Sequence, residues 1–152
     1  MAVTQNNPVL LYVTHCWEAD DDYLRVFEYL ESSNNFYYRN FSKPDARPAG
    51  GMEAQRESLR GQIAPVEVVI ATPGLWRTAR DLLEFQMIFA RAGNKPVILM
   101  GNFGSQTPLP KSLTELADEV VDWDSRALVD AIKRQARHEE SSRWDVIEFK
   151  LD

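Results

Sequence analysis

The chain of 152 residues contains little cysteine, little histidine and no long apolar run. Its single cysteine, Cys16, excludes a framework of internal disulfides. The two histidines, His15 and His138, lie far apart in the sequence and form no pattern typical of metal ligands, so we expect no bound metal. No apolar segment approaches the roughly 20 residues that a membrane-spanning helix needs.

Basic residues are also scarce relative to acidic ones. The chain has 17 lysines and arginines against 23 aspartates and glutamates, a net charge of −6. This balance argues against nonspecific binding to nucleic acid or to an anionic membrane. The first residues lack the basic region and the cleavage site of a signal peptide. We therefore expect a cytoplasmic protein that binds neither nucleic acid nor membrane.

The length predicts a single domain over residues 1–152, with its core in residues 8–138 and a C-terminal tail in residues 139–152. Apolar side chains in a charged background would suit this tail to an edge strand, to docking on the body of the domain or to contact with another subunit. Docking on the body is the expectation that we carry forward. The apolar residues of the tail are Trp144, Ile147, Phe149 and Leu151.

The stretch of residues 66–101 shows the organisation of the chain most clearly. Residues 66–71 form a nearly unbroken apolar run, which is typical of a strand buried on both faces. Apolar residues then recur at helical spacing from Trp76 until Gly93, and residues 95–100 are apolar again. This pattern predicts a helix that crosses between parallel strands. A ligand crevice is then expected at the carboxyl ends of these strands.

The same alternation extends over the rest of the chain. Strands are expected at residues 8–14, 36–41 and 118–123, and helices after Asp20 or Asp21, over residues 52–63 and 111–117, and after Asp124 or Ser125. The alternation predicts an α/β fold of the flavodoxin-like class, a three-layer sandwich with a five-stranded parallel sheet.

Several local patterns, in order, resemble the TIR-like domains, in particular the small stand-alone bacterial type of Thoeris anti-phage systems. They are YVTHCWEADD at the end of the first strand, FYYRNFSKPDARP leading into a segment similar to the family's BB loop, QMIFARAGNKPVILM and DEVVDWDSRALVDAI. The resemblance covers roughly residues 9–137. It implies a TIR-like sandwich fold.

In catalytic members of that family a helix glutamate helps to cleave the bond between nicotinamide and ribose in NAD. The resemblance therefore implies NAD as substrate, a product derived from ADP-ribose that acts as an immune signal, and an effector protein that senses the product. Self-association of TIR-like domains is also implied. The position of the family's glutamate falls on Gln86, and an amide cannot supply charge to an oxocarbenium-like transition state, so an inactive or trapped site is expected.

Four accounts of Gln86 are open from the sequence alone. It is an engineered exchange of glutamate, it belongs naturally to a module that binds without cleaving, or this face of the helix is merely structural. In the fourth account the alignment is shifted and Glu84 is the functional acid. At about 100° per residue Glu84 lies about 200° around the helix from Gln86, so only one of them faces a given crevice.

The remaining candidates for binding the nucleotide follow the expected strands. Thr14 and His15 suit a phosphate or ribose, and Trp17 suits stacking on a base. The alternative for His15 is a turn histidine bonded to the backbone, and the alternative for Trp17 is packing on its neighbours. Hydrogen bonds to ribose hydroxyls or stabilisation of a turn suit Asn40 and Ser42 equally. Trp76 would close over the ligand or pack against the helix start.

Two functions compete with an NAD nucleosidase or cyclase. One is a non-catalytic interaction module that assembles through its BB-loop-like segment, residues 42–51, and through its helices. The other is a flavodoxin-like binder of a small molecule, because this fold supports many unrelated chemistries.

Overall fold

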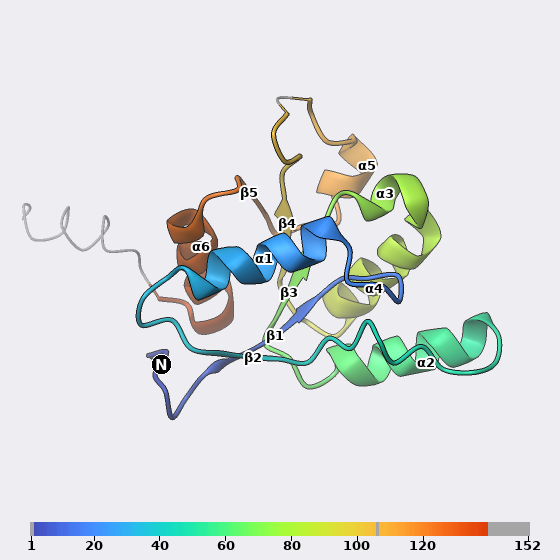
Figure 1. Cartoon of the computed structure of the whole chain (residues 1–152), viewed down its shortest axis with the longest axis horizontal. Helices are drawn as coiled ribbons and strands as arrows, with labels where there is room; N and C mark the ends of the chain where they lie inside the picture. Colours follow the sequence, from blue (N-terminus) through green and yellow to red (C-terminus); the bar gives the residue numbers. More distant parts are fainter. Residues whose placement is uncertain (1, 106, 140–152) are drawn as a thin grey trace, which may run out of the picture.

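The computed structural model describes residues 2–105 and 107–139, and Figure 1 shows their arrangement. In this part of the chain five parallel strands form one sheet in the order β2-β1-β3-β4-β5. The expected α/β class, a flavodoxin-like three-layer sandwich with a parallel sheet, is confirmed. The strands are β1 (Val9–Val13), β2 (Tyr38–Asn40), β3 (Val68–Ala71), β4 (Val97–Met100) and β5 (Glu119–Val121).

Helices cover both faces of the sheet. On one face α1 packs beside α6, and on the other α2 packs beside α4 (Figure 1). The short helices α3 and α5 contribute their buried leucines to the second face. The helices are α1 (Asp21–Glu31), α2 (Met52–Ile63), α3 (Leu75–Thr78), α4 (Arg80–Ala92), α5 (Lys111–Thr114) and α6 (Ser125–Arg137).

The central strand β3 shows why the sequence predicts a sheet buried on both sides. Successive side chains of a strand point to opposite faces. Val68 and Ile70 pack in the core beneath α1 and α6, while Val69 and Ala71 pack in the core beneath α2 and α4. All four are fully buried, so each position of the strand requires an apolar residue.

Both helices of the α1–α6 layer begin with a capping aspartate. The Asp20 carboxylate accepts the backbone N–H of Tyr23 at 2.9 Å, and Asp124 accepts that of Ala127 at 2.8 Å. Each bond satisfies an amide that has no partner within its own helix. Of the alternatives that the sequence left open, the structure selects Asp20 and Asp124.

The helix expected between Trp76 and Gly93 is in fact two helices, which corrects the prediction. Ala79, with φ −152° and ψ 55°, ends α3 and begins α4. Its N–H donates to the Leu75 carbonyl and its carbonyl accepts from Leu83, so the break leaves neither group unpaired. Leu75 of α3 and Leu83 of α4 belong to the same buried core. Both helices therefore pack on this core, although they are not one continuous helix.

Other boundaries are shorter than expected. The strand expected at residues 36–41 is β2, Tyr38–Asn40, and the helix expected at residues 111–117 is α5, Lys111–Thr114. None of the helices in residues 2–105 and 107–139 is long and apolar enough to cross a membrane. The expected docking of the tail concerns residues 139–152, which apart from Glu139 lie outside the described residues.

An ion pair between Glu67 and Arg137 ties the end of α6 to the amino edge of the sheet. Arg137 Nε lies 2.5 Å from Glu67 Oε1, and Arg137 Nη2 lies 3.0 Å from Oε2. Glu67 also accepts the N–H of Leu10 at 3.0 Å. Burial by itself raises the pKa of the Glu67 carboxyl, but the hydrogen bonds from Arg137 and Leu10 outweigh it and lower the pKa.

We expect Glu67→Gln to lower the stability at neutral pH. Because the folded-state pKa of Glu67 lies below its unfolded value, its contribution is present above the unfolded pKa and is lost as pH falls through the folded pKa. The difference in urea midpoint between wild type and variant should therefore be largest at pH 7 and shrink towards pH 3.

The matched control is Glu57→Gln, which removes an exposed carboxylate paired with Arg60 on α2. Exposed pairs of this kind contribute little to stability. A loss in Glu57→Gln equal to that in Glu67→Gln would contradict a specific role for the Glu67–Arg137 pair.

Candidate functional site

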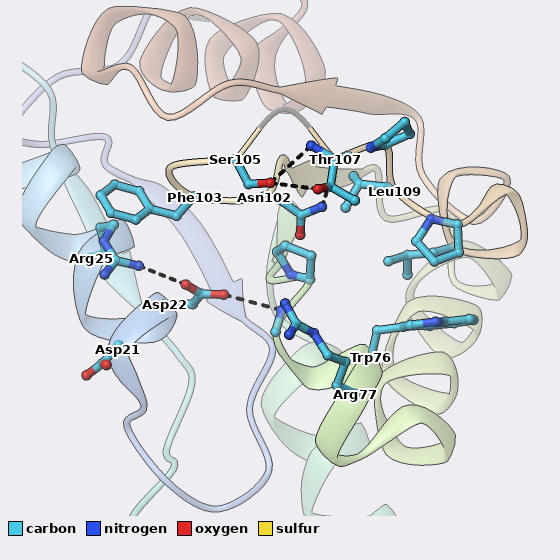
Figure 2. A pocket seen from close by; sticks show the side chains of 15 residues that line it. Asp21, Asp22, Arg25, Trp76, Arg77, Asn102, Phe103, Ser105, Thr107 and Leu109 are labelled. Atoms are coloured by element: carbon cyan, nitrogen blue, oxygen red, sulfur yellow. Dashed lines mark hydrogen bonds and ion pairs between the residues drawn. The ribbon is translucent and has the colours of Figure 1, made fainter.

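A cavity of about 650 Å³ lies at the carboxyl edge of the sheet, between the start of α1 and the loops that follow β3 and β4. The sequence predicts a ligand crevice at these loops, and this is where the structure has one. Its volume is within the range of small-molecule sites. Figure 2 shows Arg25 and Phe103 at one end of the cavity and Trp76 with Leu109 at the other.

One end of the cavity is built around the guanidinium of Arg25. It forms an ion pair with Asp22, 2.8 Å between Nη1 and Oδ1, and lies 3.7 Å from the centroid of the Phe103 ring (Figure 2). The ion pair and the ring leave the Arg25 charge already compensated. Phe103 is nevertheless 50% exposed, so this aromatic surface is open to solvent.

Asp22 also fixes the loop after β3. Its second carboxylate oxygen accepts the N–H of Gly74 at 3.3 Å. A Cβ at Gly74 would lie 2.8 Å from this oxygen, closer than real Cβ contacts, so a larger residue there would displace the Asp22 carboxylate. Asp22 therefore holds two walls of the cavity together, and both of its oxygens already have a partner.

The other groups that line the cavity are less constrained. Arg77 is exposed, and within the described part of the chain its side chain forms no ion pair or hydrogen bond. Trp76 is partly buried, and the Arg80 guanidinium lies 4.0 Å from its ring centroid. Arg80 does not line the cavity. The cavity thus offers an available cation in Arg77 and an aromatic ring in Trp76.

Gln86 lies in a different place, enclosed between α4 and the end of β1, and has no exposed surface. Its Oε1 accepts the Tyr12 hydroxyl at 2.5 Å and the N–H of His15 at 3.2 Å. Its Nε2 donates to the carbonyls of His15 at 2.9 Å and Leu82 at 3.0 Å. Every polar group of the side chain is therefore paired inside the protein.

The backbone of His15 determines which way the amide of Gln86 points. An N–H must face the amide oxygen and a carbonyl must face the amide nitrogen, so the two bonds with His15 fix the orientation. A glutamate in this place would direct an oxygen at the carbonyls of His15 and Leu82. This complementarity favours an account in which glutamine belongs at position 86.

His15 is buried beside Gln86, and its ring has two partners. Nε2 lies 3.0 Å from Gln62 Oε1, and Nδ1 accepts the N–H of Trp17 at 3.1 Å. Because Gln62 Oε1 can only accept, the neutral ring carries its proton on Nε2. Burial lowers the pKa of His15 and outweighs the hydrogen bond with Gln62 and the charge of Asp45, which both raise it.

Thr14 and Trp17 also have internal partners. The Thr14 hydroxyl accepts the N–H of Thr72 at 3.1 Å and so joins the ends of β1 and β3. Trp17 adopts a positive φ of 62° in the turn after β1, and its indole N–H donates to Gln55 at 3.0 Å. The edge of the Trp17 ring packs against His15, with 4.9 Å between the ring centroids.

Asn40 and Ser42 form a cluster with Tyr23 at the end of β2. Asn40 Oδ1 accepts both the N–H and the hydroxyl of Ser42, and Asn40 Nδ2 donates to the Tyr23 hydroxyl at 3.1 Å. The Ser42 hydroxyl lies 2.8 Å from that of Tyr23. These contacts stabilise the turn after β2, which is the alternative that the sequence left open for both residues.

The structure therefore separates the candidates from the sequence into two places. Only one of them, Trp76, lines the cavity; the others are paired inside the carboxyl ends of β1 and β2 and beneath α4. Glu84 is partly buried on another side of α4 from Gln86. Sequence reasoning missed Arg25 and Arg77. The position of Arg77 directly after Trp76, in a loop already expected to bind ligand, was the signal that could have identified it.

Comparisons with known proteins assign no family to the chain, so its class is stated from the fold. No family model matches the chain, and no curated protein matches it either. In residues 2–105 and 107–139 no group of three or more histidine, cysteine, aspartate or glutamate side chains is placed to hold a metal ion. The candidate site is accordingly defined by the cavity and its side chains.

We expect Gln86→Glu to lower the melting temperature at pH 7 by roughly 5 °C or more, because a buried carboxylate would face two carbonyl oxygens. Those surroundings raise the pKa of the new carboxyl above its unfolded value. The penalty therefore grows as pH rises above about 4.3, and the gap between variant and wild type narrows towards pH 4. Thermal unfolding measured between pH 4 and 8 tests this.

Glu84→Gln is the matched control on the same helix, since it exchanges the same two groups at a partly buried position. It should change the melting temperature by no more than a degree or two. A Gln86→Glu variant as stable as wild type at pH 7 would mean that the amide is not required.

We also expect the stability to decrease as pH falls below about 6.5, the ordinary pKa of histidine. The folded-state pKa of His15 is lowered, so the unfolded chain takes up the proton first and stability is lost until the pH reaches the folded pKa. In His15→Gln, whose amide can still donate to Gln62, this part of the loss of stability with falling pH should disappear. Urea unfolding of wild type and variant at pH 7.5 and 5.5 measures the loss in each protein. An equal loss of unfolding free energy in both would contradict the prediction.

Proposed function

We propose that this protein is a TIR-like domain that binds NAD or a nucleotide derived from ADP-ribose in the cavity at the carboxyl edge of the sheet. We further propose that it does not cleave the nicotinamide–ribose bond while Gln86 occupies the position of the glutamate. The observation that carries the proposal is the cavity itself, with an uncompensated cation, Arg77, and an aromatic ring, Trp76. Both lie in α3, directly after β3, at the edge of the sheet where flavodoxin-like folds bind ligands.

The composition of the cavity supports a ligand that is both planar and anionic. Trp76 suits the stacking of a base, and Arg77 suits a phosphate because its guanidinium forms paired hydrogen bonds with phosphate oxygens. Asn102 lies on the loop after β4, beside Ser105 and Thr107 (Figure 2). Its amide nitrogen donates to the carbonyl of Thr107 at 2.9 Å, and its amide oxygen is available to ribose hydroxyls. Dinucleotides combine all three kinds of group.

The surroundings of Gln86 support binding without cleavage. Cleavage of the glycosidic bond develops positive charge on the ribose, which a carboxylate stabilises and an amide does not. Gln86 is fully enclosed. Two aspartates line the cavity. Asp22 is already bonded to Arg25 and Gly74, and the exposed Asp21 has no such bonds.

The resemblance extends this proposal to anti-phage defence. The bound nucleotide would be the immune signal or its precursor, and an effector protein would respond to it indirectly. Self-association of the domain belongs to the same proposal. Activity in an assembly with neighbouring subunits is therefore measured at high as well as low protein concentration.

The test is calorimetric titration of the full chain with NAD and with ADP-ribose, together with chromatography of nicotinamide released from NAD. We expect binding to wild type and no release. Glu84→Gln serves as the control and should bind as wild type does. Absence of binding to both nucleotides at millimolar concentration, or release of nicotinamide by wild type, would contradict the proposal.

Gln86→Glu in the same assay tests where the reacting ribose lies. Gln86 is fully buried and does not line the cavity, so we expect no release of nicotinamide by this variant. Release by this variant alone would mean that the ribose binds beside α4 rather than in this cavity, in an NAD-cleaving scaffold whose acid is replaced. Binding without release in both proteins would assign a domain that only binds the nucleotide.

A further inference from the structure

One end of the cavity is lined by an aromatic ring and aliphatic side chains, a chemistry that suits a planar ring. It lies between Trp76, after β3, and the apolar residues Leu109, Pro110 and Leu113 before and within α5. We call these four residues the base slot. Figure 2 shows the Trp76 ring edge-on on the same side of the cavity as Leu109.

The two faces of the Trp76 ring have different surroundings. The Arg80 guanidinium covers one face at 4.0 Å from the centroid, and Arg80 does not line the cavity. The other face is therefore the one that Trp76 presents to the cavity. A cation on the outer face fixes the ring and leaves the inner face free for a second stacking partner.

The residues that accompany Trp76 at this end of the cavity are apolar. Leu113 is fully buried and Leu109 is partly buried, and both belong, like Trp76, to the hydrophobic cluster beneath α2 and α4. The prolines flanking Leu109 have no side-chain donor or acceptor, and a proline ring is rigid. A ring that enters this space meets an aromatic face on one side and aliphatic groups on the other.

The available cation stands directly beside the slot in the sequence. Arg77 follows Trp76 in α3, lines the same cavity and has no ion pair among the described residues. Arg25, the other cation of the cavity, is compensated by Asp22 and stacked on Phe103. A phosphate in the cavity therefore has one preferred partner, Arg77.

We propose that the base slot holds the purine of the nucleotide and that Arg77 binds its diphosphate. This inference rests on the proposed function and adds the orientation of the ligand to it. Trp76 and Arg77 are then the specificity-determining residues, one for the ring and one for the charge. The end of the cavity with Arg25 and Phe103 remains for the part of the ligand beyond the diphosphate.

The test measures binding of ADP-ribose and, by competition, of adenosine to the full chain. Trp76→Leu should weaken the binding of both about tenfold or more, because stacking of one base is worth about that much, and Trp76→Phe should retain most of it. Arg77→Ala should weaken ADP-ribose about tenfold and reduce its dependence on salt, while the affinity for adenosine stays within twofold of wild type.

Arg47→Ala is the matched control, because it removes an exposed arginine that lies outside the cavity. It should leave the binding of ADP-ribose within about threefold of wild type. Circular dichroism and melting temperature of each variant separate loss of binding from loss of fold.

The outcomes distinguish this inference from the proposed function. If wild type binds neither NAD nor ADP-ribose, the proposed function fails and this orientation fails with it. If wild type binds ADP-ribose and folded Trp76→Leu and Arg77→Ala bind it equally well, only the orientation is wrong. An equal loss in Arg77→Ala and Arg47→Ala would also overturn it, since general attraction to positive charge would then explain the binding.

Discussion

The pair of hydrogen bonds between the Gln86 amide and the backbone of His15 determines the arrangement of this edge of the sheet. It joins the middle of α4 to His15, which follows β1 and Thr14 in the chain. The Tyr12 hydroxyl donates a further hydrogen bond to the amide oxygen of Gln86. Both backbone groups of His15 would otherwise be buried without partners in the helix or the sheet. The turn after β1 can therefore take the tight course that places Trp17 at a positive φ.

This arrangement has a consequence for the chemistry. The carboxyl ends of β1 and β2 are filled by side chains that bond one another, from His15 and Gln62 to Asn40 and Ser42. The cavity proposed to bind the nucleotide lies instead between α1 and the loops after β3 and β4, where Asp22 bridges Arg25 to Gly74. A flavodoxin-like sheet offers several crevices along one edge, and the side chains decide which of them is open.

The fold could be predicted from local patterns because each depends on neighbours in the sequence. Apolar runs such as that of β3 require burial on both faces, and Asp20 and Asp124 are placed to cap the helices that follow them. The break at Ala79 could not be predicted, since alanine is the strongest helix former and nothing in its sequence marks an end. It depends on how α3 and α4 pack on the same core.

The sequence by itself determined the order of strands and helices, the carboxyl edge as the place of the crevice, and Gln86 as a position of special interest. The tertiary structure alone decided that Gln86 is paired on every polar atom and that Trp76 and Arg77 face the cavity. The physical reason is that hydrogen bonds such as those of Gln86 join residues more than 70 positions apart. Such contacts exist only once the sheet has assembled, and no local pattern encodes them.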